Sequence, residues 1–173
     1  SVVPCAFEFN RPAMITVGSQ HTASGAWSGS QTVTVRATSS QLWTIGGGWS
    51  GFSGRLVADS GNPRIRLNGT TNVNFGSTAV AVDLGSGAAQ LMNRNGATID
   101  LGALSASGAS TALSGTQTGT AATTYRVGAL GTDEVFAGSI NDGSGPCSIV
   151  KNGSGAWTLT GASSHTGTTT VAA

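Results

Sequence analysis

The sequence predicts an all-β fold, a right-handed parallel β-helix in which short strands stack coil upon coil. The heptapeptide that begins at Thr98 recurs from Thr124, 26 residues later, a spacing that suits one turn of a β-solenoid. Apolar and polar residues alternate within each copy, and a period of two is the period of a strand. Glycine occurs 27 times in 173 residues, and no segment has a convincing helical period.

The expected strands are apolar-polar-apolar triplets. The two apolar side chains of a triplet point one way and the polar side chain points the other way. Stacked triplets would therefore bury a continuous apolar column and turn their polar residues toward solvent. The triplets are Val33-Thr34-Val35, Ile65-Arg66-Leu67, Ile99-Asp100-Leu101 and Tyr125-Arg126-Val127.

Glycines are expected to form the bends between strands. Gly102 and Gly128 follow the two copies of the repeat at the same position, and glycine accepts backbone conformations that other residues avoid. A weaker copy at residues 81–85 lies 17 residues upstream. It predicts that Asp83 and Asp100 occupy equivalent places in neighbouring coils.

An up-and-down or sandwich arrangement of antiparallel strands is the structural alternative. Its signature is longer strands joined by Asn-Gly or Asp-Gly turns, and such dipeptides are present. The 26-residue repeat favours the parallel helix. The dipeptides are Asn68-Gly69, Asn95-Gly96, Asp142-Gly143 and Asn152-Gly153.

Residues 1–173 are expected to form one domain, because no linker divides them. Residues 1–22 differ in composition, since they hold Phe7, Phe9 and two prolines. We expect this segment to cap the open end of the apolar column or to run along its outside as a strap. Residues 23–173 would form the coils. Because the coil pattern continues to the last residue, we also expect the chain to be a segment of a larger protein.

Charge is scarce in this chain. Only 9% of the residues are charged, against about a quarter in ordinary soluble domains. The eight Lys and Arg residues form no basic cluster along the sequence, so nucleic acid is not an expected partner. No run approaches the roughly 18 apolar residues of a membrane span, so a membrane is not expected either. A surface of hydroxyls and amides is common in secreted β-solenoids.

Cys5 and Cys147 could form a disulfide in an extracellular protein. Coils rise about 4.8 Å each, whereas bridged Cα atoms lie within about 7 Å of each other. The bridge would therefore require residues 2–20 to run back along the outside of the helix. We favour the bridge, because two unpaired thiols are less usual in a secreted protein.

Four aromatic residues form the candidate ligand site: Trp27, Trp43, Trp49 and Phe52. Indole faces are good platforms for sugar rings, and the three glycines at 46–48 would leave the flanking rings above a shallow groove. The alternative is that these rings fill the core or close the end of the helix. The polar residues that could bind sugar hydroxyls from adjacent coils are Arg64, Arg66, Asn72, Asn74 and Arg94.

No catalytic, metal or cofactor site is expected. Catalysis by carboxylates needs a pair about 5 to 10 Å apart, and outward polar positions explain Asp83 and Asp100 better than a cleft does. His21 and His165 match no metal-ligand spacing. Residues 141–145 are expected to form a turn rather than a calcium loop. We therefore expect no enzyme activity in this segment by itself.

The last stretch, residues 152–173, reads NGSGAWTLTGASSHTGTTTVAA. Its short β-prone runs alternate with Gly, Ser and Asn. It resembles the autotransporter-associated β-strand repeat, which forms one coil of a parallel β-helix. The family usually has an Asn and an aromatic residue before the second Thr-Gly, where this chain has Ser163, Ser164 and His165. The resemblance implies a secreted, extracellular scaffold.

Strand repeats of this kind also occur in large secreted glycoside-degrading proteins, and the aromatic cluster resembles β-helical carbohydrate-binding modules. These resemblances imply a non-catalytic module that binds a plant cell-wall polysaccharide, with a xylan-type chain favoured, and that targets a covalently linked glycoside hydrolase. The alternative is a structural stalk or adhesin passenger of an autotransporter. Because a spacer has no use for exposed tryptophans, burial of Trp43 and Trp49 would favour that alternative.

Overall fold

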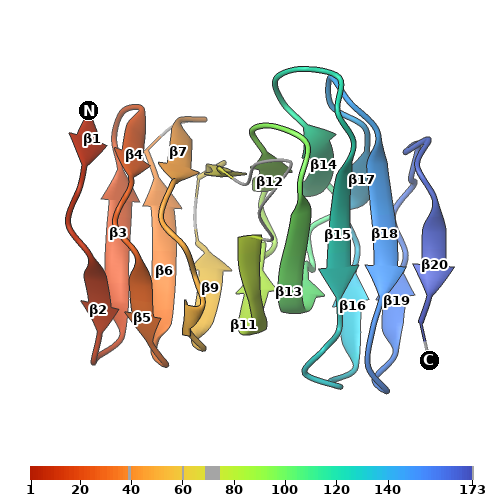
Figure 1. The fold of residues 1–173 in the computed structure, drawn as a ribbon, viewed down its shortest axis with the longest axis horizontal. Helices are drawn as coiled ribbons and strands as arrows, with labels where there is room; N and C mark the ends of the chain where they lie inside the picture. Colours follow the sequence, from red (N-terminus) through yellow and green to blue (C-terminus); the bar gives the residue numbers. More distant parts are fainter. Residues whose placement is uncertain (39, 60, 69–74, 173) are drawn as a thin grey trace.

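The computed structural model describes residues 1–38, 40–59, 61–68 and 75–172, and the regular elements in these ranges are all β-strands, joined by turns and loops (Figure 1). Within the same ranges the chain has no helix that could cross a membrane. The strands stack in about seven turns of a parallel β-helix, as the sequence predicts, and all strand pairs are parallel.

Seven strands make one face of the helix, which we call the first face. In stacking order they are β1 (Val2–Val3), β4 (His21–Ala23), β7 (Leu42–Ile45), β10 (Arg64–Leu67), β12 (Gln90–Asn93), β14 (Ala112–Thr116) and β17 (Ser139–Asn141).

The remaining strands belong to three further sheets. The largest contains β3 (Ala13–Val17), β6 (Thr32–Ala37), β9 (Arg55–Ala58), β11 (Phe75–Asp83), β13 (Thr98–Ser105), β15 (Thr123–Val127), β18 (Cys147–Lys151) and β20 (Thr169–Val171). The small ones are β2 (Phe7–Phe9), β5 (Trp27–Gly29) and β8 (Gly51–Phe52), and β16 (Glu134–Phe136) with β19 (Trp157–Leu159).

The largest sheet crosses from one face of the helix to another through the long strands β11 and β13. Their first halves pair with each other, and the first half of β13 also pairs with β15 on its other side. Their second halves also pair, but β11 there meets β9, and Ala106 after β13 bridges Phe136 of β16. A register shift between Ser77 and Ala81 marks the corner. The β-helix therefore has three faces along its whole length. Two of these faces belong to one hydrogen-bonded sheet, because β11 and β13 extend over both.

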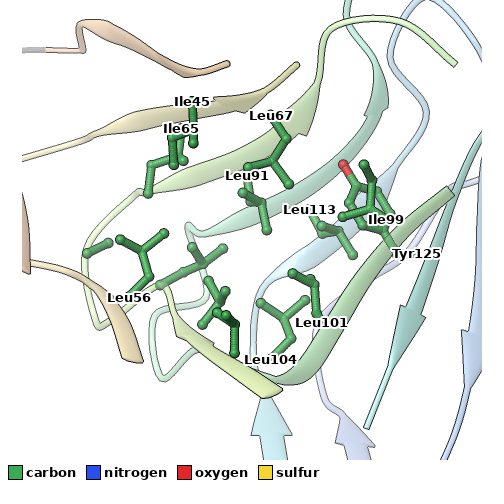
Figure 2. Close-up of a cluster of buried hydrophobic side chains, with 14 of the residues drawn as sticks. Ile45, Leu56, Ile65, Leu67, Leu91, Ile99, Leu101, Leu104, Leu113 and Tyr125 are labelled. Atoms are coloured by element: carbon green, nitrogen blue, oxygen red, sulfur yellow. The ribbon is translucent and has the colours of Figure 1, made fainter. Parts of the chain in front are cut away.

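The core is a set of apolar columns, one residue per coil. On the first face, Trp43, Ile65, Leu91, Leu113 and Ile140 lie directly above one another. Figure 2 shows how the side chains of neighbouring coils follow one another through the interior. Each fully buried Leu or Ile contributes about 1.5 to 3 kcal/mol relative to exposure, so the columns supply most of the stabilisation.

The 26-residue repeat is confirmed in the register of β13 and β15. Thr98 pairs with Thr124, and Leu101 pairs with Val127. Between them, Asp100 and Arg126 face each other and form a two-pronged ion pair with N–O distances of 2.6 Å. The first four positions of the repeat thus match in neighbouring coils residue for residue, whereas residues 102–104 continue β13 and residues 129–130 form a turn.

The weaker copy at residues 81–85 is not equivalent to the main repeat. Asp83 pairs with Ser105, and the residue opposite Asp100 is Gly76. The physical reason is that β11 and β13 each run along two faces. The same apolar-polar-apolar pattern therefore occurs twice within one coil, and the pattern does not specify which face a strand joins.

The N-terminal segment forms the first coil and so covers the end of the stack. β1, β2 and β3 pair in parallel with β4, β5 and β6. Residues 1–22, expected as a cap or an outer strap before coils that begin at residue 23, are instead a coil of the stack themselves, because their strands continue the parallel sheets.

The predicted disulfide between Cys5 and Cys147 is wrong, since both cysteines are free. Cys5 lies in the first coil, whereas Cys147 opens β18 near the other end of the stack. Several coil rises of about 4.8 Å separate them, and without a strap the chain cannot bring their Cα atoms within bridging distance.

Candidate functional site

The four aromatic residues of the predicted ligand site lie together in the core. Trp27, Trp49 and Phe52 are 1% exposed and Trp43 is 4% exposed. Trp27 is their centre, with ring centroids 5.5 Å from Trp43, 6.0 Å from Trp49 and 5.6 Å from Phe52. The structure therefore has the core-filling arrangement that the sequence left as an alternative.

The glycines around these tryptophans serve close packing of the backbone. A Cβ atom at Gly25 would lie 1.7 Å from the carbonyl oxygen of Cys5, and one at Gly47 would lie 1.7 Å from the carbonyl oxygen of Gly25. The coils thus approach each other at this corner as only glycine allows. The glycine run does not expose the flanking rings.

The polar residues predicted to accompany the aromatic site lie elsewhere, on the outer side of the first face. Arg64 and Arg66 belong to β10, and Arg94 directly follows β12. Asn72 and Asn74 fall outside the described residues. The structure therefore separates the arginines from the tryptophans, because odd and even positions of a strand face opposite sides.

Arg66 is held by residues of two other coils. Its Nε donates to Oγ1 of Thr44 at 3.0 Å, and its Nη1 donates to Oε1 of Gln117 at 2.8 Å. Partial burial is the main cause that lowers the pKa of Arg66, followed by the positive charges of Arg94 and Arg64. The three guanidinium groups are therefore close enough to repel one another.

A hollow of about 240 Å³ lies against Arg64 and against Gln117, the hydrogen-bond partner of Arg66. We call the three arginines together with this hollow the arginine groove. Amide, hydroxyl and thioether side chains line it along with Arg64, and they are Gln90, Met92, Ser114, Gln117 and Ser144. The groove can therefore offer positive charge and hydrogen bonds on one surface.

A second, more apolar hollow of about 250 Å³ lies in the first coils. Val3, Phe7, Ile15, Val17 and Trp43 contribute to its wall. These residues belong to the interior columns or to the edge of the first coil. We therefore interpret the hollow as the end of the hydrophobic core.

The carboxylates considered for catalysis do not converge. Asp83 pairs with Arg55 and Asp100 pairs with Arg126, and the two aspartates lie on different faces. Among the described residues, no three His, Cys, Asp or Glu side chains are placed to hold a metal ion.

Sequence reasoning missed a buried polar cluster at a corner of the middle coils. Asn93, Thr116 and Thr123 are fully buried, and the two threonine hydroxyls lie 2.8 Å apart. The hydroxyl of Tyr125 donates to the carbonyl oxygen of Ser114 at 2.7 Å, and burial raises the pKa of Tyr125 well above its usual value. Polar residues at alternate, inward positions such as Asn93 were the available signal.

Asp142 links the last coil to the coil before it. Its carboxylate accepts hydrogen bonds from the backbone of Cys147 at 2.7 Å and from the hydroxyl of Thr166 at 2.7 Å. The Thr166 hydroxyl is the main cause that lowers the pKa of Asp142, and the Cys147 amide is the next. Residues 141–145, expected as a turn, begin at the end of β17 and form the connection to β18, and Asp142 makes this connection a contact between coils.

The last coil matches a known family. A model of the passenger-associated-transport-repeat fits residues 149–173, which include β19 and β20. This match supports the resemblance to autotransporter repeats, and such a repeat implies a secreted or surface-exposed protein. No curated protein and no solved structure matches the chain. The resemblance to carbohydrate-binding modules has no support among these comparisons.

Proposed function

We propose that this chain is a segment of the β-helical passenger of an autotransporter-like protein and acts as a stiff extracellular spacer. The passenger-repeat match over residues 149–173 carries the proposal, because it falls on one coil of the stack. That coil pairs with the preceding coils through β18, β19 and β20. Each added repeat then lengthens the rod by about 4.8 Å.

Bonds between coils support a stiff rod. All three ion pairs among the described residues join one coil to the next: Arg36 to Asp59, Arg55 to Asp83, and Arg126 to Asp100. Each coil also hydrogen-bonds to its neighbours along several strands. Bending the rod would break several such ladders at once.

Burial of the aromatic cluster favours the spacer over a polysaccharide-binding module. The module required indole faces that stack on sugar rings, and Trp27, Trp43 and Trp49 are all enclosed. A catalytic role is not part of the proposal, since Asp83 and Asp100 are both engaged by arginines.

The rigidity can be tested by a spin-label distance measurement. Met14 and Thr158 are exposed, and they occupy matching places in the first coil and in β19. Six inter-strand steps separate them, so labels at Met14→Cys and Thr158→Cys should lie about 30 Å apart. A Cys5→Ser background removes the other exposed thiol.

A narrow distance distribution centred near that value supports the spacer, and a broad one would contradict it. The same labels in concentrated urea give the reference for a flexible chain. Gels that contain xylan or mixed-linkage glucan provide a second check, because a spacer should migrate as it does in plain gels. Retardation by a neutral glycan would contradict the spacer and support the polysaccharide-binding module instead.

A further inference from the structure

We propose that the arginine groove binds the carboxylate or sulfate groups of an acidic polysaccharide. The spacer proposal assigns no ligand to this surface, and the present inference does not depend on it. Three steps carry the inference: the arginines have no carboxylate partner among the described residues, one guanidinium is already oriented, and the adjoining hollow suits a sugar unit.

The first step is the contrast between two sets of arginines. Arg36, Arg55 and Arg126 each meet an aspartate of a neighbouring coil. In the described part of the chain, no carboxylate lies within ion-pair distance of Arg64, Arg66 or Arg94. A chain with a net charge of +1 thus gathers three uncompensated positive charges on one surface. An anion placed there would relieve their repulsion.

The second step is the preorganisation of Arg66. Its hydrogen bonds to Thr44 and Gln117 hold the guanidinium across the outer side of the first face. A side chain that is already ordered loses less conformational entropy when a ligand binds. Partial burial also strengthens its attraction to an anion, because the effective dielectric constant there is lower than in water. Planar guanidinium groups match the geometry of carboxylate and sulfate oxygens.

The third step is the form of the groove. At about 240 Å³ the hollow is smaller than a typical drug-sized pocket, and it suits a single sugar unit. Gln90, Ser114 and Ser144 offer hydrogen-bonding groups for hydroxyls. Arg66 and Arg94 lie on successive coils, and Arg94 lies two residues beyond Met92, the residue that pairs with Arg66. Two anionic groups of one oligosaccharide would therefore contact the two arginines at different positions across the first face.

Nucleic acid fits this surface less well. A phosphate backbone requires a track of basic residues, and the rest of the first face is neutral: its outward residues beyond the arginines include Thr44, Ser114 and Asn141. The groove therefore favours a ligand whose charges are few and whose other contacts are hydroxyls.

Calorimetric titration of the intact chain tests the proposal. The probes are a heparin oligosaccharide for sulfate, an oligogalacturonate for carboxylate, dextran as a neutral glycan, inorganic sulfate and single-stranded DNA. The double variant Arg64→Gln/Arg94→Gln removes two charges from the groove. Arg11→Gln is the control, because Arg11 is exposed in the first coil, far from the groove.

At least one acidic oligosaccharide should bind the intact chain, and the double variant should bind it at least about tenfold more weakly. Arg11→Gln should change the affinity by less than about twofold. Circular dichroism should show the same fold in all three proteins.

Several outcomes would overturn the proposal. One is the absence of binding to both acidic oligosaccharides below about 1 mM at moderate salt. Another is an equal loss in Arg11→Gln and in the double variant. Equal affinity for DNA would indicate non-specific attraction of polyanions, and equal affinity for inorganic sulfate would indicate an ion site that does not recognise a glycan. None of these outcomes affects the spacer distance measurement.

Discussion

Gly47 and Gly48 are adjacent in sequence but differ in how closely the neighbouring coil approaches them. A Cβ atom at Gly47 would collide with the backbone of Gly25, whereas a Cβ atom at Gly48 would meet nothing within 4 Å. Gly47 is buried and Gly48 is exposed. At this scale the stack depends on the close approach of two backbones at single positions.

Gly47→Ala should therefore lower the free energy of unfolding by about 2 to 3 kcal/mol, because the coils must move apart to admit the methyl group. Gly48→Ala should change it by at most about 0.5 kcal/mol. Urea unfolding followed by tryptophan fluorescence measures both values. Equal effects of the two substitutions would refute the close-packing explanation of Gly47.

The two cysteines differ in environment as strongly as the two glycines. Cys5 is exposed, whereas burial raises the pKa of the Cys147 thiol to about 12. Only the thiolate reacts with disulfide reagents. In native protein, one thiol per chain should react rapidly with Ellman's reagent, and in denaturant without reductant two should react. Detection of no free thiols in denaturant would instead show that Cys5 and Cys147 are bridged.

At the scale of the element, Asp142 connects the turn before β18 to the last coil. Its pKa lies below the ordinary value because hydrogen bonds favour the charged form. A carboxylate with a lowered pKa stabilises the folded state at pH values above its unfolded pKa of about 4. That stabilisation is lost as the pH falls through the lower, folded value.

The attachment of the last coil should therefore weaken below about pH 4. The amide resonance of Thr166, which donates to Asp142, reports this change in an NMR titration. In Asp142→Asn the acid-induced change at Thr166 should disappear. Its persistence in that variant would assign the pH dependence to another group.

On the scale of the whole molecule, stability is distributed unevenly along the stack. Coils in the middle are covered on both sides, as the buried columns of β10 to β15 show. Inward residues of the outer coils are less protected, with Val3 39%, Leu159 40% and Val171 77% exposed. In a repeat protein each coil is stabilised mainly by its neighbours.

Hydrogen exchange should therefore be fastest in β1, β2, β19 and β20 and slowest in the middle strands. Peptide-resolved exchange with mass spectrometric detection measures this profile. Uniform protection from the first coil to the last would indicate that the chain unfolds as one unit and would contradict the picture of independent end coils.

The arginine groove shows how far a site could be predicted from the sequence. Arg64, Arg66 and Arg94 were selected as polar partners in adjacent coils, and they do lie together. That no carboxylate of the described residues pairs with them could not be predicted, because ion pairs here join residues 23 to 28 positions apart in neighbouring coils. Such pairing depends on the register of the stack.

The sequence by itself determined the parallel β-helix and the pairing of residues 98–101 with 124–127, because period-two alternation and a constant repeat length are local properties that stacking converts directly into register. Only the tertiary structure decided that Trp27, Trp43 and Trp49 are buried, that Cys5 and Cys147 are apart, and that Asp83 and Asp100 lie on different faces. Each of these outcomes depends on where the chain bends from one face of the helix to the next. The positions of these bends are determined by contacts between coils, which no local sequence pattern encodes.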